Sequence, residues 1–148
     1  MTNNTIAKKL IELAQLDIDA AYAYEQALGS IEHSAIHAQI SSFRDDHLRH
    51  INELSALIRQ LGEEPPAHTK DFKGFLIAGF TAIRSMTGTE GALKAMQGNE
   101  KLTNKTYQEA LSWDLTPDAR ALIEKNYADE KRHLQYITTT LEARSWEK

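Results

Sequence analysis

The sequence predicts an all-α fold, a four-helix bundle of two antiparallel hairpins joined by a long crossover. Three observations lead to this prediction. Apolar residues recur at helical spacing over most of the chain, no segment shows the period-two alternation of strands, and prolines occur only at positions 65, 66 and 117. With 148 residues, 41% of them hydrophobic, the chain is long enough for one domain with a core. We therefore expect a single domain over residues 1–148.

The first two helices are predicted by two apolar stripes, over residues 6–28 and 36–61. Gly29 and the polar residues after it separate the stripes, which favours a hairpin with a short loop. The second helix is expected to stop at Gly62, because glycine suits the position after a helix and the two prolines that follow cannot continue it.

The residues after these prolines, KDFKGFLIAGFTAIRSMTG, have apolar content of their own, and we interpret them as a crossover that contains a short helix. A capping-box pattern at residues 87–90 predicts the start of a third helix, which runs to about Trp113. Thr116 and Pro117 have the residue types of an N-cap and a first helical position. They predict a last helix that ends near Ala143.

Composition narrows the classes of function. The formal net charge is -4 with mixed signs along the chain, which does not favour nucleic acid or an anionic membrane as a partner. The chain begins directly with a helical pattern rather than a signal peptide, so we expect a cytoplasmic protein. The absence of cysteine excludes disulfides, iron–sulfur ligation and thiolate zinc sites. Any metal must therefore be held by oxygen and nitrogen.

The chain contains an internal repeat. A shift of 83 positions places residues 6–61 over residues 89–144 without a gap, and YEQAL at 24–28 falls on YQEAL at 107–111. Polar residues within the apolar stripes also coincide. The pairs are Asp17 with Glu100, Tyr24 with Tyr107, Asp46 with Asp129, His47 with Glu130, and His50 with His133.

Six of these polar residues share faces with core residues, and the helical rise brings them to one height in the bundle. They are Asp17, His47, His50, Glu100, Glu130 and His133. An isolated ionised carboxylate is too costly to leave unpaired in an apolar core. Two interpretations remain open, a buried polar network and a site for one or two cations. Oxygen and imidazole ligands suit iron, manganese or zinc, and the order of affinities alone does not choose among them.

Four neighbouring residues are candidates for supporting this site. Asp46 and Asp129 each lie four residues before a candidate histidine ligand, where a carboxylate can accept the imidazole N–H, although a solvated role is equally open. Tyr24 and Tyr107 can hydrogen-bond ligand carboxylates or simply fill the core. The Lys and Arg residues are interpreted as solvated faces. Surface or capping roles are expected for two further histidines, His33 and His37.

With these residues identified, the sequence resembles the ferritin-like superfamily, and specifically the rubrerythrin-type di-metal bundles. The segments GEEP and GNEKLTNKTYQEAL are similar to a bacterial ferritin-like family of unassigned function. The superfamily pattern is a glutamate on the first and third helices and Glu-x-x-His on the second and fourth. Glu100, Glu130 and His133 match this pattern. Asp17 replaces a longer glutamate, and His47 stands where a bridging glutamate is usual.

The resemblance implies di-iron-type redox chemistry with O₂ or peroxide, of an oxidase, ferroxidase or peroxidase kind, with electrons from an external donor. It implies that Glu130 bridges two ions, that His47 binds only one of them, and that the other four site residues are terminal ligands. The two departures predict either an asymmetric dinuclear site or one tight and one weak ion. The alternatives are metal binding or storage without catalysis, and a structural, stress-related bundle. Assembly as a homodimer is also left open, and no catalytic residue is assigned.

Overall fold

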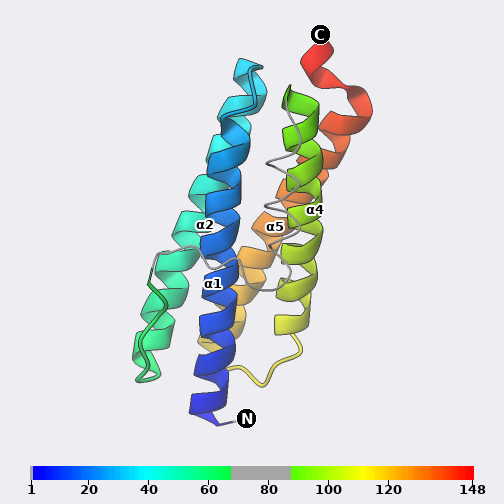
Figure 1. Cartoon of the computed structure of the whole chain (residues 1–148). Coiled ribbons are helices and arrows are strands. Elements are labelled where there is room, and N and C mark those ends of the chain that lie inside the picture. The colour runs from blue at the N-terminus through cyan, green and yellow to red at the C-terminus, as the bar shows by residue number, and fades with distance from the viewer. Residues whose placement is uncertain (1, 68–87) are drawn as a thin grey trace.

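The computed structural model describes residues 2–67 and 88–148, and it confirms an all-α four-helix bundle (Figure 1). Helices α1 (Asn3–Leu28) and α2 (Ser34–Gln60) form the first hairpin, and α4 (Gly88–Ala110) and α5 (Pro117–Ala143) form the second. A short 3₁₀ helix, η1 (Ser145–Glu147), follows α5. The expected short helix of the crossover, and Thr87 of the expected capping box, lie outside the described residues.

The two hairpins are inverted relative to one another. Figure 1 shows α1 and α5 running in one direction and α2 and α4 in the other. Helix α1 packs against α2 and α4, α4 packs against α5, and the contact between α2 and α5 is the loosest of these four. The repeat in the sequence therefore corresponds to an approximate twofold axis perpendicular to the bundle. Equivalent residues of the two hairpins face one another across it.

The helix ends follow local chemistry. Gly62, two residues after the last residue of α2, has φ +85°, a left-handed conformation that favours glycine. The Thr116 side chain accepts the Ala119 N–H at the start of α5, with Pro117 in the first turn. His33 has the expected capping role, because its Nδ1 accepts the Ile36 N–H at the start of α2.

Helix α4 ends at Ala110, three residues earlier than the pattern predicted. The guanidinium of Arg120 donates to the main-chain oxygens of Leu111 at 2.7 Å and Trp113 at 2.9 Å. These bonds satisfy carbonyl groups that follow the helix. The side chain on α5 therefore stabilises a turn where the apolar pattern alone favoured continued helix.

The core of the described residues has two large apolar clusters with a polar layer between them, and a small third cluster of Ile18, Ala21 and Ile51. The first, called the Phe43 cluster, includes Tyr24, Ile40, Phe43, Leu93, Met96 and Ile137. The second, called the Tyr107 cluster, includes Leu10, Leu13, Leu54, Ile58, Tyr107 and Ile123. Each of the two large clusters draws on both hairpins and contains one of the two equivalent tyrosines. The polar layer is therefore closed by apolar side chains along the bundle in both directions.

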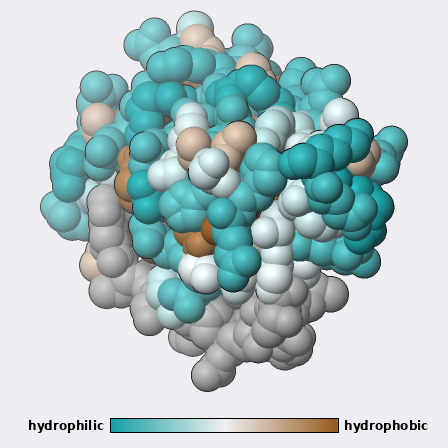
Figure 2. Space-filling view, turned by 90° about the horizontal axis from the view of Figure 1, so that it is seen from above, coloured by the Kyte–Doolittle hydropathy of each residue, from teal (hydrophilic) through white to brown (hydrophobic). Residues whose placement is uncertain are grey.

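The end of the bundle seen from above in Figure 2 is mainly hydrophilic, with hydrophobic residues in small areas of its coloured surface. No helix within residues 2–67 and 88–148 is long and apolar enough to cross a membrane.

Candidate metal centre

The polar layer contains the six residues that the sequence predicted to meet. Every one of them is buried, with at most 1% of its surface exposed. They come from all four helices: Asp17 from α1, His47 and His50 from α2, Glu100 from α4, and Glu130 and His133 from α5. Each lies on the apolar stripe of its helix, so the same burial that forms the core turns these side chains inward.

The six residues form two overlapping groups of four. Asp17, His47, His50 and Glu130 make the first group, and His47, Glu100, Glu130 and His133 make the second. Within each group the candidate donor atoms all lie within 4.8 Å of one another. His47 and Glu130, which are equivalent in the repeat, belong to both groups and join them.

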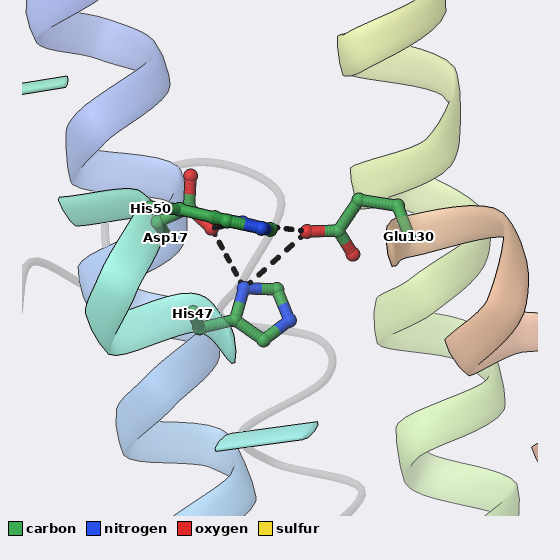
Figure 3. Close-up of side chains that lie close together, drawn as sticks. All are labelled: Asp17, His47, His50 and Glu130. Carbon is green, nitrogen blue, oxygen red and sulfur yellow. Dashed lines mark hydrogen bonds and ion pairs between the residues drawn. The ribbon is translucent and has the colours of Figure 1, made fainter. Parts of the chain in front are cut away.

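The first group is shown in Figure 3. Asp17 Oδ1 lies 2.7 Å from His47 Nδ1 and 3.0 Å from His50 Nδ1. Glu130 Oε1 approaches from the opposite side and lies 3.4 Å from each of these two nitrogens. Donors that surround one ion tetrahedrally at about 2.1 Å are separated by about 3.4 Å. The spacing of these four side chains is therefore compatible with a transition-metal ion among them.

The second group uses the other ends of the shared residues. Glu100 Oε1 lies 3.2 Å from His47 Nε2 and 3.1 Å from His133 Nδ1. Glu130 Oε2 lies 3.5 Å from His133 Nδ1. His47 thus presents one ring nitrogen to each group, and Glu130 presents one carboxylate oxygen to each group. The expectation that His47 would serve one ion only does not follow from this geometry, because both of its nitrogens face candidate ligands.

The three imidazoles are positively charged in the absence of metal. Burial lowers the pKa of each, but facing carboxylates outweigh burial. They raise the pKa of His47 to about 9, that of His133 to about 11 and that of His50 to about 12. Three buried cations therefore stand beside three buried carboxyl groups.

The three carboxyl groups differ from one another. Burial raises the pKa of Asp17, but His50 and His47 outweigh it and lower the value to about 2. The pKa of Glu100 is held well below its usual range, because His133 and His47 outweigh its burial. The pKa of Glu130 is raised, because burial and the negative charge of Glu100 both disfavour its ionised form. Glu130 Oε1 has no hydrogen-bond partner among the described residues, so one buried ligand atom is unsatisfied.

The two tyrosines bond to carboxylates of the opposite hairpin. The Tyr24 hydroxyl donates to Glu100 Oε1 at 2.8 Å, and the Tyr107 hydroxyl donates to Asp17 Oδ2. Burial raises the pKa of both tyrosines, so each stays protonated as a donor. Each tyrosine therefore orients a carboxylate that its own hairpin does not supply.

The two aspartates are also exchanged between hairpins. His50 Nε2 donates to Asp129 Oδ2 at 2.9 Å, and His133 Nε2 donates to Asp46 Oδ2 at 2.8 Å. The sequence suggested partners four residues apart on one helix. The structure differs because Nδ1 of each ring faces the core, which directs Nε2 across the interface between α2 and α5. Such a bond fixes the ring orientation and leaves Nδ1 available as a ligand.

Two arginines complete this outer arrangement, and sequence reasoning had treated them only as solvated charges. Arg49 pairs with Asp46 at 3.1 Å and with Asp129, while Arg132 pairs with the same carboxylates at 2.9 and 3.0 Å. Their side chains are 41% and 51% exposed, so they cover the site on its solvent side. The repeat shift places Arg49 over Arg132, so the sequence could have indicated that both arginines belong with the other paired polar residues.

Thr103 and Asn104 also contact the site, and neither was predicted. Thr103 Oγ1 lies 3.0 Å from Glu100 Oε2 and 3.1 Å from Glu130 Oε2. Asn104 Nδ2 donates to the main-chain oxygens of Glu100 and Glu130 at 2.8 and 2.9 Å. Both residues fall on alanines under the repeat shift, so the repeat gave no indication of them.

One comparison with known proteins identifies a family. The family described as "Domain of unknown function (DUF2383)" matches residues 5–112. The matched region includes four of the six site residues, Asp17, His47, His50 and Glu100, and ends before α5. No curated protein matches the chain.

Proposed function

This chain belongs to the DUF2383 family, and we propose that it is a ferritin-like metalloprotein whose bundle core binds one or two transition-metal ions. We further propose iron as the main candidate, with manganese and zinc as alternatives. The reaction class is di-iron-type redox chemistry with O₂ or peroxide as substrate and an external electron donor.

The observation that carries the proposal is the shared pair His47 and Glu130. Each of the two residues presents one donor atom to each group, and Glu130 Oε1 is buried 3.4 Å from two imidazole nitrogens without a hydrogen-bond partner among the described residues. Leaving a buried carboxylate oxygen unsatisfied is costly. A cation between the carboxylates and imidazoles satisfies this atom, because it binds oxygen and nitrogen lone pairs together.

The donor set supports a redox metal. Each group offers two imidazoles and two carboxylates, a set that suits iron or manganese and includes the two-histidine, one-carboxylate combination of non-haem iron sites. Iron bound there supplies one-electron redox chemistry that the side chains themselves lack. Metal binding requires each of the three imidazolium rings to lose one proton. The metal ions then supply the positive charge that these protons carried.

Residues around the candidate ligands fix their orientation and limit the access of water. Asp129 orients His50 and Asp46 orients His133, in each case from the opposite hairpin. The tyrosines orient Asp17 and Glu100, and the two large apolar clusters exclude water along the bundle. The arginine and aspartate cover lies on the solvent side between α2 and α5, the loosest of the four helix contacts. We propose this interface as the route by which small molecules reach the core.

A structural role is the second candidate, and one observation favours it. Apart from Glu130 Oε1, the site's carboxylate oxygens and ring nitrogens have partners among the described residues, and three imidazolium ions face three carboxyl groups. The polar layer can therefore exist without metal as a network that fixes helix register. An unchanged melting temperature when metal is added to the metal-free protein favours this candidate, because a ligand that binds only the folded state must raise stability.

The deciding experiment is the metal content per chain of protein purified without chelators. It compares the wild type with Glu130→Ala and with Glu124→Ala, a matched control at an exposed position of α5. We expect between one and two iron or manganese ions in the wild type and in Glu124→Ala, and none in Glu130→Ala.

Turnover is then measured with iron(II), O₂ and peroxide. Repeated turnover supports an oxidoreductase, and stoichiometric uptake alone supports metal storage. A wild-type protein without metal that takes up none on reconstitution overturns the proposal.

A further inference from the structure

The repeat places Phe43 of α2 and Asn126 of α5 at equivalent positions, although one is apolar and the other polar. Both are wholly buried. Phe43 lies in an apolar cluster and packs on His133, with ring centroids 4.2 Å apart and planes inclined at 30°. One of the two imidazoles with exchanged aspartates is thus covered by an aromatic ring.

The helix register predicts that Asn126 lies opposite His50, as Phe43 lies opposite His133. Helices α2 and α5 are antiparallel, and the Phe43–His133 contact fixes how they face one another. His50 lies seven residues after Phe43 along α2, and Asn126 lies seven residues before His133 along α5. Two helical turns in opposite directions keep the residues facing. The tyrosines obey the same symmetry, since Tyr107 meets His50 edge-on at 5.9 Å as Tyr24 meets His133 at 6.3 Å.

Asn126 differs from Phe43 in having unsatisfied polar atoms. Neither its Nδ2 nor its Oδ1 has a hydrogen-bond partner within the described part of the chain. The Asn126 amide faces the Tyr107 hydroxyl closely enough to lower the pKa of the tyrosine, against the larger, raising effect of burial, but the two groups are not placed for a hydrogen bond of ordinary geometry. One turn further along the same face of α5 is Glu130, whose Oε1 also has no hydrogen-bond partner within the described part of the chain. Three unsatisfied polar atoms therefore belong to the half of the site that contains Asp17 and His50.

A buried amide that lacks both partners costs free energy comparable to lost hydrogen bonds, and native proteins rarely retain one without a role. In the other half, a phenyl ring fills the same position. We propose that the two halves of the site differ in access to small molecules, and that Asn126 hydrogen-bonds a small anion or polar ligand beside His50 and Glu130. This inference rests on the proposed metal site and identifies which half of it receives an external ligand.

The charge of the ligand set supports an anion at this position. Two divalent ions bring four positive charges, and Asp17, Glu100 and Glu130 supply three negative ones while the bound imidazoles are neutral. The outer cover adds no net charge, because two arginines face two aspartates. One positive charge remains, and a small anion held by the Asn126 amide offsets it.

Azide is a suitable probe, because its binding to cobalt(II)-loaded protein changes the visible absorption of the metal. The test compares the wild type with Asn126→Leu and with Phe43→Leu, the same replacement at the equivalent position. We expect Asn126→Leu to weaken azide binding about tenfold or more, as for the loss of a hydrogen bond to a charged group, while cobalt content is unchanged. Phe43→Leu is expected to change azide affinity less than about threefold, because it removes no polar partner.

A second measurement does not involve metal. The melting temperature of the metal-free protein is expected to rise by about 3 °C in Asn126→Leu, because the change removes an unpaired buried amide, and to fall in Phe43→Leu. If Asn126→Leu does not fold, Asn126→Ala replaces it with the same expected loss of azide affinity, since a smaller side chain cannot overpack the core.

The outcomes separate the two proposals. A wild-type protein that takes up no cobalt overturns the proposed function together with this inference. Normal cobalt uptake with no azide binding, or with equal azide affinity in the wild type and Asn126→Leu, overturns the inference alone.

Discussion

The two hairpins of the bundle share a framework but differ in the groups that they bring to the core. In both, a tyrosine bonds a carboxylate of the opposite hairpin, and an aspartate accepts the N–H of a histidine from the opposite hairpin. Neither hairpin can build its half of the site alone. The framework contacts therefore make the site a consequence of how the hairpins dock.

The differences lie at the positions closest to the candidate ions. Asp17 of the first hairpin corresponds to Glu100 of the second, and His47 corresponds to Glu130. The first hairpin thus contributes two imidazoles and one carboxylate, and the second contributes one imidazole and two carboxylates. A backbone with near-twofold symmetry therefore holds an asymmetric ligand set, so the two groups are expected to bind metal with unequal strength.

The largest expected effect comes from removing a ligand that only one group contains. Asp17→Asn affects the first group, and Glu100→Gln affects the second; each change replaces a charged ligand with a neutral amide of similar shape. We expect each variant to bind one ion fewer than a wild type that binds two, as measured by metal content per chain. If the wild type binds one ion, only one variant loses it, and that variant identifies the occupied group. Loss of all metal from both variants of a two-ion protein would contradict the division into two groups.

A smaller effect is expected when the two hairpins are made alike. His47→Glu gives the first hairpin the ligand pattern of the second and places a fourth carboxylate in the core. In the metal-free protein it removes a cation that pairs with Asp17 and Glu100, so we expect the free energy of unfolding to fall by about 3–5 kcal/mol. The loaded protein recovers stability, because metal binds only the folded state. Thermal melting with and without metal measures this difference, and an unchanged metal-free protein would show that His47 is not a counter-ion.

Much of the candidate site follows from two features of the sequence. The helical spacing of the stripes and the 83-residue repeat together place six polar residues at one height, and the structure brings them together. The same features do not reveal which way a side chain turns. His50 and His133 reach across to the other hairpin for their aspartates, a choice that depends on how α2 faces α5.

The repeat also misses residues that lack a counterpart of similar type. Thr103 falls on an alanine, and Asn126 falls on Phe43, so neither pair stands out as polar residues in register. The early end of α4 is a further example, because it depends on Arg120 of α5 rather than on the local pattern. Contacts between distant segments decide each of these features, and a pattern within one segment does not contain them.

The smallest expected effect tests the bond from each of the two aspartates to a histidine of the opposite hairpin. Asp46→Asn and Asp129→Asn form the matched pair. An amide can no longer accept the N–H as a charged partner, so the ring is held and polarised less strongly, and metal affinity is expected to fall about 10- to 100-fold. Because Asp46 bonds His133 and Asp129 bonds His50, Asp46→Asn should weaken the second group and Asp129→Asn the first. If each aspartate instead acted on the histidine four residues later in its own helix, Asp46→Asn would weaken the first group and Asp129→Asn the second.

The assignment can be measured by combining each change with the variants that remove one group. In the Glu100→Gln background only the first group remains, so Asp129→Asn should lower the affinity of the remaining ion and Asp46→Asn should leave it nearly unchanged. In the Asp17→Asn background the two effects should exchange. Asp45→Asn, at a neighbouring side chain that is 63% exposed and pairs with Arg44, is the control for loss of a nearby charge. Equal effects of both aspartates in both backgrounds would show that they act through the general charge of the cover, since only a specific bond to one imidazole distinguishes the two groups.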